Sequence, residues 1–299
     1  MNTTMRIARH ARIVAALLAA GFGVAGHAEE ASAPNAAAAP HAPPTNWNDT
    51  MVGYRYSDDF YFPGSANKVT QNIGYLQTLG GFKYGNYFFN VDYLMSDENN
   101  PEANGNGGAQ EVYSVGHVEW SASKIFGQPV SFYGVRDVGL TTGFEFSAKN
   151  DAFGSRARML VIGPTLEFAV PHGFWNLTVG ARTESNHNGI VHADVRYDTA
   201  WHVESGWLIP FSLGPVPLTF KGFAAITGPK AKDGFHQDTE TETLTRMSLL
   251  VDVGSFAGVP RTFYAGPGYE YWKNMFGTPA SEAPGTKRSA PMFVGEVHF

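Results

Sequence analysis

Residues 87–95, Tyr87-Phe88-Phe89-Asn90-Val91-Asp92-Tyr93-Leu94-Met95, alternate over most of their length between apolar and polar side chains. Because successive side chains of a β-strand point to opposite faces, Val91 shares one face with aromatic residues, while Asn90 and Asp92 share the other. Residues 174–184, 194–204 and 246–253 repeat this arrangement. Their apolar faces hold Trp175, Leu177, Val179 and Ala181, then Val195, Tyr197, Thr199, Trp201 and Val203, then Met247, Leu249, Val251 and Val253. The pattern predicts strands with one apolar and one polar face.

The same alternation runs from about residue 50 to the last residue and is interrupted by turn-forming residues. We count about twelve strands by this pattern, near residues 50–58, 69–83, 86–96, 110–121, 130–147, 155–170, 173–185, 193–206, 216–227, 241–253, 261–275 and 288–299. Connections after odd-numbered strands are long and polar, whereas those after even-numbered strands tend to be shorter, with residues 206–215 as an exception. This rhythm is typical of a membrane barrel with both chain ends on the inner side.

The composition also favours a barrel. Of the 299 residues, 43% are hydrophobic and only 16% are charged, yet no apolar run beyond residue 30 has the length of a membrane helix. A closed barrel is the other structure that pairs every backbone polar group inside lipid. The chain has no cysteine, which excludes disulfide frameworks and Cys nucleophiles. Its net charge of -6 argues against a nucleic-acid partner, which would require a basic surface.

The N-terminus predicts export. Arg6, Arg9 and Arg12 precede a short apolar run over residues 13–20, and small residues lead to Ala28. This order is that of a secretory signal peptide, whereas the apolar run is too short for the alternative of a membrane anchor. We therefore expect a signal peptide over residues 1–28 that is cleaved near Ala28, an Ala/Pro-rich flexible linker over 29–46 and a barrel over 47–299.

The C-terminal strand fixes the class of barrel. Phe293, Gly295, Val297 and the terminal Phe299 share one face. Outer-membrane barrels end on such an aromatic residue, which the barrel-assembly machinery recognises; a soluble edge strand that happens to end on Phe is the alternative. The sequence thus predicts an all-β protein, a transmembrane antiparallel β-barrel of about twelve strands in the outer membrane of a Gram-negative bacterium.

The polar faces of the strands are the predicted pore lining. Both charge signs occur on them, so the lining favours hydrogen bonding to small uncharged polar solutes over selection of one ion sign. Three aromatic residues, Phe60, Tyr264 and Trp272, are candidates for stacking on a planar ring, worth about 1–3 kcal/mol in other stacking sites. The competing interpretation is that these charged side chains form structural ion pairs with one another and do not bind solute. The predicted lining comprises Arg55, Asn90, Asp92, Arg136, Arg182, Glu184, Arg196, Asp198, Glu204, Lys221, Arg246, Asp252 and Glu270, with Phe60 and Trp272 as solute-binding aromatics.

Six segments along the predicted barrel resemble, in the same order, motifs of a known protein family. They are residues 53–56, 88–97, 108–113, 134–144, 163–166 and 268–277, followed by the terminal Phe299. In these segments the chain resembles the Tsx-like family of nucleoside-specific outer-membrane channels, in its "outer envelope protein" branch. The resemblance implies a monomeric twelve-stranded barrel with a narrow pore for facilitated diffusion of nucleosides. Met275 stands where that branch is expected to carry a basic residue.

Other functions remain as alternatives. A non-specific porin, a channel for small aromatic solutes and a plugged structural barrel share the predicted fold. Residues 184–189 contain Ser185 and His187 and faintly resemble the site of an outer-membrane lipid hydrolase, but no second segment supplies the expected nucleophile. His187, His192 and Asp194 match no established spacing of metal ligands. We therefore expect no enzymatic activity, no metal site and no cofactor.

Overall fold

The computed structural model describes residues 46–105 and 107–299. The predicted signal peptide lies outside the described residues, as does the predicted linker apart from Asn46. The strands are β1 (Trp47–Phe60), β2 (Val69–Phe82), β3 (Gly85–Ser96), β4 (Gln110–Ser121), β5 (Val135–Asn150), β6 (Arg156–Phe168), β7 (Phe174–Asn188), β8 (Ala193–Arg196), β9 (Ala200–Leu213), β10 (Val216–Thr227), β11 (Glu242–Asp252), β12 (Phe263–Lys273) and β13 (Lys287–His298). The short helices are η1 (Pro101–Ala103), α2 (Ala122–Phe126), η2 (Val253–Ala257) and η3 (Met275–Gly277).

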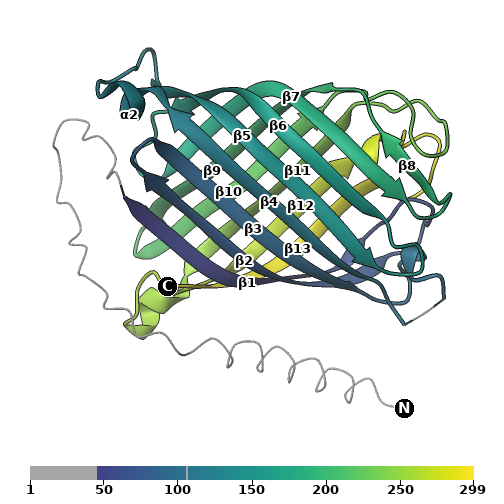
Figure 1. Cartoon of the computed structure of the whole chain (residues 1–299). Coiled ribbons are helices and arrows are strands. Elements are labelled where there is room, and N and C mark those ends of the chain that lie inside the picture. Colours follow the sequence, from purple (N-terminus) through teal and green to yellow (C-terminus); the bar gives the residue numbers. More distant parts are fainter. Residues whose placement is uncertain (1–45, 106) are drawn as a thin grey trace. The chain divides into compact units, whose positions relative to one another are not determined.

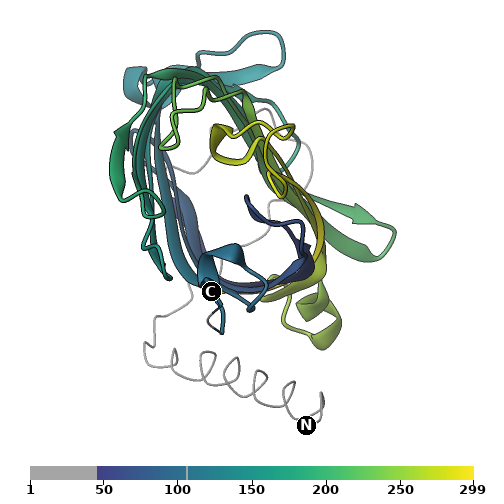
Figure 2. The same ribbon diagram turned by 90° about the vertical axis from the view of Figure 1, so that its right-hand side faces the viewer.

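Twelve of these strands close into one antiparallel barrel (Figures 1 and 2). Each wall strand pairs with the wall strand that follows it in the chain, and β1 pairs with β13 to close the wall, with Tyr54 opposite Gly295. The thirteenth strand, β8, pairs only with the last residues of β7 and therefore stands outside the closed wall. The predicted antiparallel barrel of about twelve strands is confirmed.

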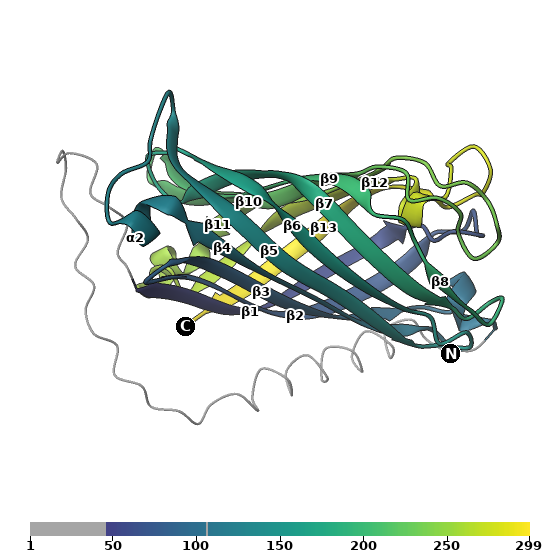
Figure 3. The ribbon, with the colours of Figure 1, turned by 45° about the horizontal axis from the view of Figure 1, so that its top comes forward.

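The two ends of the barrel differ (Figures 1 and 3). The start of β1, helix α2 and the C-terminus lie at one end, here called the terminal end; β8 and the connections after β1, β3 and β5 lie at the other, here called the loop end. The predicted long connection at residues 206–215 is wrong, because β9 continues to Leu213 and turns within two residues into β10. The terminal end instead has longer connections at residues 122–134 and 253–262, which hold α2 and η2.

The outer surface carries large apolar side chains, whereas the interior holds charged side chains beside apolar clusters. Leu160, Val179 and Phe293 are 62%, 52% and 55% exposed on the outer surface, while Asp92 and Glu270 are 2% and 0% exposed inside. In a soluble protein, large apolar residues are most often buried, and charged residues are almost never fully buried unless they are paired. The predicted faces of β3, β7, β11 and β13 are confirmed, and the barrel has the surface of a transmembrane protein.

No helix in the described part of the chain is long and apolar enough to cross a membrane.

Two predicted strands have other bounds. The stretch predicted at 130–147 becomes a strand only at Val135, after a turn in which Tyr133 and Gly134 have positive φ angles, and it continues to Asn150. The stretch predicted at 193–206 is divided: β8 ends at Arg196, and β9 begins at Ala200. The alternation continues through both parts because β8 also pairs as a strand, so sequence periodicity alone cannot distinguish it from the wall.

This division corrects three assignments. Arg196 and Asp198 were predicted to line the lumen, but both are exposed at the loop end, outside the wall. Tyr197 was predicted to face lipid, but it is buried, and the Lys230 ammonium lies 4.3 Å from the centre of its ring.

Candidate pore lining and its constrictions

A chain of ion pairs crosses the middle of the barrel. Arg55 on β1 forms an ion pair with Asp92 on β3, and Arg246 on β11 reaches the same carboxylate at 3.5 Å. In the wall, β3 and β11 are separated by β2, β1, β13 and β12. A contact between inward side chains of two such distant strands must cross the lumen. Side chains rather than open space therefore span the barrel at this level.

The chain continues toward the loop end through Glu270 on β12. The Arg246 guanidinium lies 2.7 Å from one carboxylate oxygen of Glu270, and Arg288 on β13 lies 2.7 Å from the other. Asn90 donates a hydrogen bond of 2.7 Å to Asp92. We call Arg55, Asp92, Arg246, Glu270 and Arg288 the central ion-pair chain. Its signs alternate, so each charge is neutralised by its neighbours.

A second group of charges lies on β5, β7 and the connection after β10. Arg182 lies 3.8 Å from Glu184 and 4.0 Å from Glu145, and Lys230 lies 2.5 Å from Glu184. The hydroxyl of Tyr113 on β4 donates to Glu145. Both predicted residues of this group, Arg182 and Glu184, are thus inside the barrel and paired.

Toward the terminal end an apolar cluster lies inside the barrel beside the charged residues. Met51, Tyr75 and Leu79 from β1 and β2 form a buried cluster, and side chains from the far wall pack against it. Among these are Phe174 on β7 and Leu208 on β9, which stand opposite each other on paired strands. We call these five residues the apolar constriction. A constriction of this kind can close a pore by excluding water.

In the structure, other side chains of the protein already lie against the rings of the predicted stacking residues. Phe60 is 1% exposed, and the Arg288 guanidinium lies 4.6 Å from its ring centre. The same guanidinium lies 5.5 Å from the ring centre of Trp272, whose indole N–H donates to Glu242. Tyr264 lies instead near the terminal end, with its ring 4.6 Å from that of His298. A planar solute could stack on Phe60 only by displacing Arg288.

Other predicted lining residues have local structural partners. Arg136 lies toward the terminal end, where its guanidinium is 2.8 Å from Glu167. Asp252 accepts hydrogen bonds from Ser255 and from the backbone of Arg261, and thereby caps η2. Lys221 forms an ion pair of 2.7 Å with Glu296. These contacts fit the competing interpretation, in which lumen charges serve the structure.

Sequence reasoning missed Arg288 and Glu296, although the signal was present. Arg288 and Glu296 lie on the face of the last strand that is opposite to the apolar face with Phe293, so the same periodicity places both side chains inside the barrel. Arg288 ends the central ion-pair chain and also donates a hydrogen bond of 2.7 Å to the carbonyl of Tyr61. Glu296 accepts hydrogen bonds from Tyr75 and Lys221.

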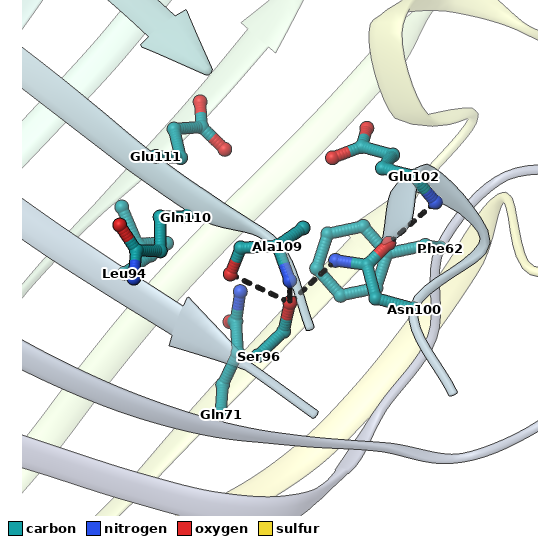
Figure 4. A pocket seen from close by; sticks show the side chains of 9 residues that line it. All are labelled: Phe62, Gln71, Leu94, Ser96, Asn100, Glu102, Ala109, Gln110 and Glu111. Atoms are coloured by element: carbon teal, nitrogen blue, oxygen red, sulfur yellow. Dashed lines mark hydrogen bonds between the residues drawn. The ribbon is translucent and has the colours of Figure 1, made fainter. Parts of the chain in front are cut away.

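A small pocket lies at the loop end, between the ends of β2, β3 and β4 and the loop that holds η1 (Figure 4). Its empty volume, which includes open solvent, is about 180 Å³. The side-chain oxygen of Gln71 in its lining is buried without a hydrogen-bond partner, whereas Ser96 accepts a hydrogen bond from Asn100. The lining residues are Phe62, Gln71, Leu94, Ser96, Asn100, Glu102, Ala109, Gln110 and Glu111.

The structure provides only part of the side-chain geometry that a lipid hydrolase needs. His187 lies 2.7 Å from Asp194 on β8, and Ser185 is on the same outward face of β7. Within the part of the chain that the structure describes, no hydrogen bond joins the Ser185 hydroxyl to the His187 ring. A serine nucleophile needs that contact to lose its proton.

Comparison with known proteins gives only distant likeness. No protein family and no curated protein matches the chain, so the resemblance to Tsx-like channels stays a prediction. Among solved structures, an outer membrane channel from Pseudomonas putida F1 has a TM-score of 0.49 at 12% identity, covering 86% of this chain and 97% of that one. A bacterial polysaccharide outer membrane secretin has a TM-score of 0.42 at 9% identity, covering 85% and 99%. The KdgM porin in complex with oligogalacturonate has 0.41 at 7%, covering 83% and 99%. Likeness of this degree carries no argument about solutes or mechanism.

Proposed function

We propose that this protein is an outer-membrane channel for the passive diffusion of small polar solutes, narrowed at rest by the central ion-pair chain and the apolar constriction. One observation carries the proposal: charges of both signs are buried inside a barrel whose outer surface is apolar, as Asp92 and Val179 exemplify. Charged side chains inside a membrane protein are costly, and they usually mark a place where polar solutes pass or bind. Alternating signs offer donors and acceptors to a neutral solute without selecting one ion strongly.

The proposed location and assembly follow from the same features. The predicted signal peptide would deliver the chain to the periplasm, and Phe299 is exposed at the terminal end, where the barrel-assembly machinery could bind it. Within the closed wall no strand edge is free for another copy, which is compatible with a monomer.

Nucleosides are the finer proposal for the cargo, supported by the resemblance to Tsx-like channels. A nucleoside is neutral, rich in hydroxyl groups and planar at its base. It could compete with Arg288 for the faces of Phe60 and Trp272. Weak binding at several such points would allow release as well as capture.

A plugged structural barrel is the second candidate, and the contact between Arg246 and Asp92 across the lumen favours it. The two functions differ in one measurable property, the passage of solute through the closed wall.

We expect purified protein in planar bilayers to give small, stable conductance steps that adenosine or thymidine blocks at lower concentration than glucose does. Once Arg288 is displaced, a planar base stacks on the rings of Phe60 and Trp272 more strongly than glucose, which has no planar ring, and this accounts for the difference. Equal block by all three solutes would replace the nucleoside proposal by a general porin. Absence of both conductance steps and liposome swelling, in protein shown to be folded by its heat-dependent gel mobility, would overturn the channel and leave the structural barrel.

A further inference from the structure

Three exposed arginines gather on the outer surface at the loop end. Arg158 on β6 stands opposite Ser185 on β7, which stands opposite Arg196 on β8. Residues directly opposite on neighbouring antiparallel strands carry their side chains on one face, and the strands lie about 4.8 Å apart, so the two arginine backbones are roughly 10 Å apart. The next row outward places Arg156 opposite His187. All three arginines are exposed.

This basic patch, Arg156, Arg158 and Arg196, continues the lipid-facing surface. Toward the middle of the barrel, the same face of β6 carries the exposed Leu160 and Ile162. Trp201, exposed on β9, stands opposite Ala181 in the row of Ile162. That row is four residues from the row of Ser185, or roughly 13 Å along the strand. Tryptophan is enriched near the boundary between hydrocarbon and headgroups, and the arginines lie farther toward the loop end than Trp201, at headgroup depth.

The patch lacks the pairing found inside the barrel. Across residues 46–105 and 107–299, Arg55, Arg182, Arg246 and Arg288 all form salt bridges, whereas the three patch arginines form none. Asp194, the one acid in the two rows, is hydrogen bonded to His187 at 2.7 Å. That bond, with the positive charge of His187, Arg156 and Arg158, holds the pKa of Asp194 below its ordinary value. The positive charge of the patch therefore exceeds its negative charge.

We propose that this patch binds the phosphorylated headgroup of a lipid in the leaflet that faces the loop end. The proposal rests on the proposed membrane location. Guanidinium groups form paired hydrogen bonds to phosphate oxygens, and the sheet fixes the spacing of the arginine backbones before the ligand arrives. The acyl chains of the same lipid would cover Leu160 and Ile162 directly below. A free phosphate would gain nothing from that apolar surface, so the lipid is the occupant that uses both features.

The test measures binding of diphosphoryl lipid A to the full-length barrel in detergent by native mass spectrometry. We expect the double variant Arg158→Gln/Arg196→Gln to bind lipid A at least ten-fold more weakly than the unchanged protein. The variant Arg261→Gln removes an exposed arginine from the terminal end and serves as the matched control, with binding unchanged. Phosphatidylcholine, whose phosphate charge is balanced by its own choline cation, should bind the three proteins equally.

Two results would overturn the proposal. One is equal binding of lipid A to the double variant and to the Arg261→Gln control. The other is competition by inorganic phosphate at concentrations no higher than those of lipid A, which would assign the patch to a free anion. Conductance recorded from the same samples separates this proposal from the channel: the double variant should conduct normally, because both side chains lie outside the lumen. Absent conductance in the unchanged protein would overturn the channel alone.

Discussion

Replacing Val179 with arginine should lower the free energy of unfolding of the barrel by about 2–4 kcal/mol. Val179 lies midway along β7 on the outer face and is 52% exposed there, with Leu177 and Ala181 as its apolar neighbours on the same face. If lipid covers this face, a guanidinium at this depth must either enter hydrocarbon or draw water into it. In a water-covered protein, the same substitution at an exposed position would change stability by less than about 0.5 kcal/mol.

The matched control for this prediction is Ser185→Arg. Ser185 is on the same face of the same strand, six residues nearer the loop end and at the level of the basic patch. We expect its effect to stay within about 1 kcal/mol, because the cost of a charge falls toward the membrane interface. Reversible urea unfolding in phospholipid vesicles, followed by tryptophan fluorescence, measures both. Equal stability of the two variants would show that Val179 does not face hydrocarbon.

Replacing Asp92 with asparagine should shift the pore toward anions and lower the free energy of unfolding by about 3–5 kcal/mol. Asp92 is the carboxylate shared by Arg55 and Arg246, and it is 2% exposed. The amide keeps the shape of the side chain but leaves Arg55 without a counter-charge, and Arg246 keeps only Glu270, which it shares with Arg288. Free positive charge at the narrowest part of a pore attracts anions. The reversal potential in a salt gradient measures the shift, and the strands should still assemble.

The variant Arg196→Gln is the control for this second prediction. Arg196 was expected in the lumen from its periodicity, but it lies on β8 outside the wall. We therefore expect an unchanged reversal potential. A shift in this variant comparable to that of Asp92→Asn would contradict the assignment of the central ion-pair chain as the selective part of the pore.

The fold could be predicted from sequence periodicity because every strand of a barrel wall alternates between lipid-facing and lumen-facing residues. Along β3, for example, Val91 meets lipid and Asp92 meets the lumen, so hydrophobicity alternates with each residue. The rule failed at Arg196 and Tyr197, where β7 continues beyond the wall and β8 pairs back on it. A strand outside the barrel satisfies the same alternation, and only the closure of the wall distinguishes the two.

The partners across the lumen could not be predicted. Periodicity states that Arg246 and Asp92 face inward, but they are 154 residues apart, and their contact depends on strand tilt and on the cross-section of the closed barrel. The contact between the Arg288 guanidinium and the Phe60 ring could not be predicted for the same reason. The face of each residue follows from local sequence, whereas its neighbour across the lumen follows from the closed structure.

Labelling from the hydrocarbon phase tests the central claim most directly. A photoactivated carbene reagent dissolved in the acyl chains of vesicles that hold the folded protein would be mapped by mass spectrometry of its peptides. We predict modification of Val91, Val179 and Val251, and no modification of Asn90, which is adjacent in sequence to Val91 but faces the lumen. Unlabelled valines at these three positions, or labelling of Asn90 to the same extent as Val91, would contradict a barrel whose outer wall is covered by lipid.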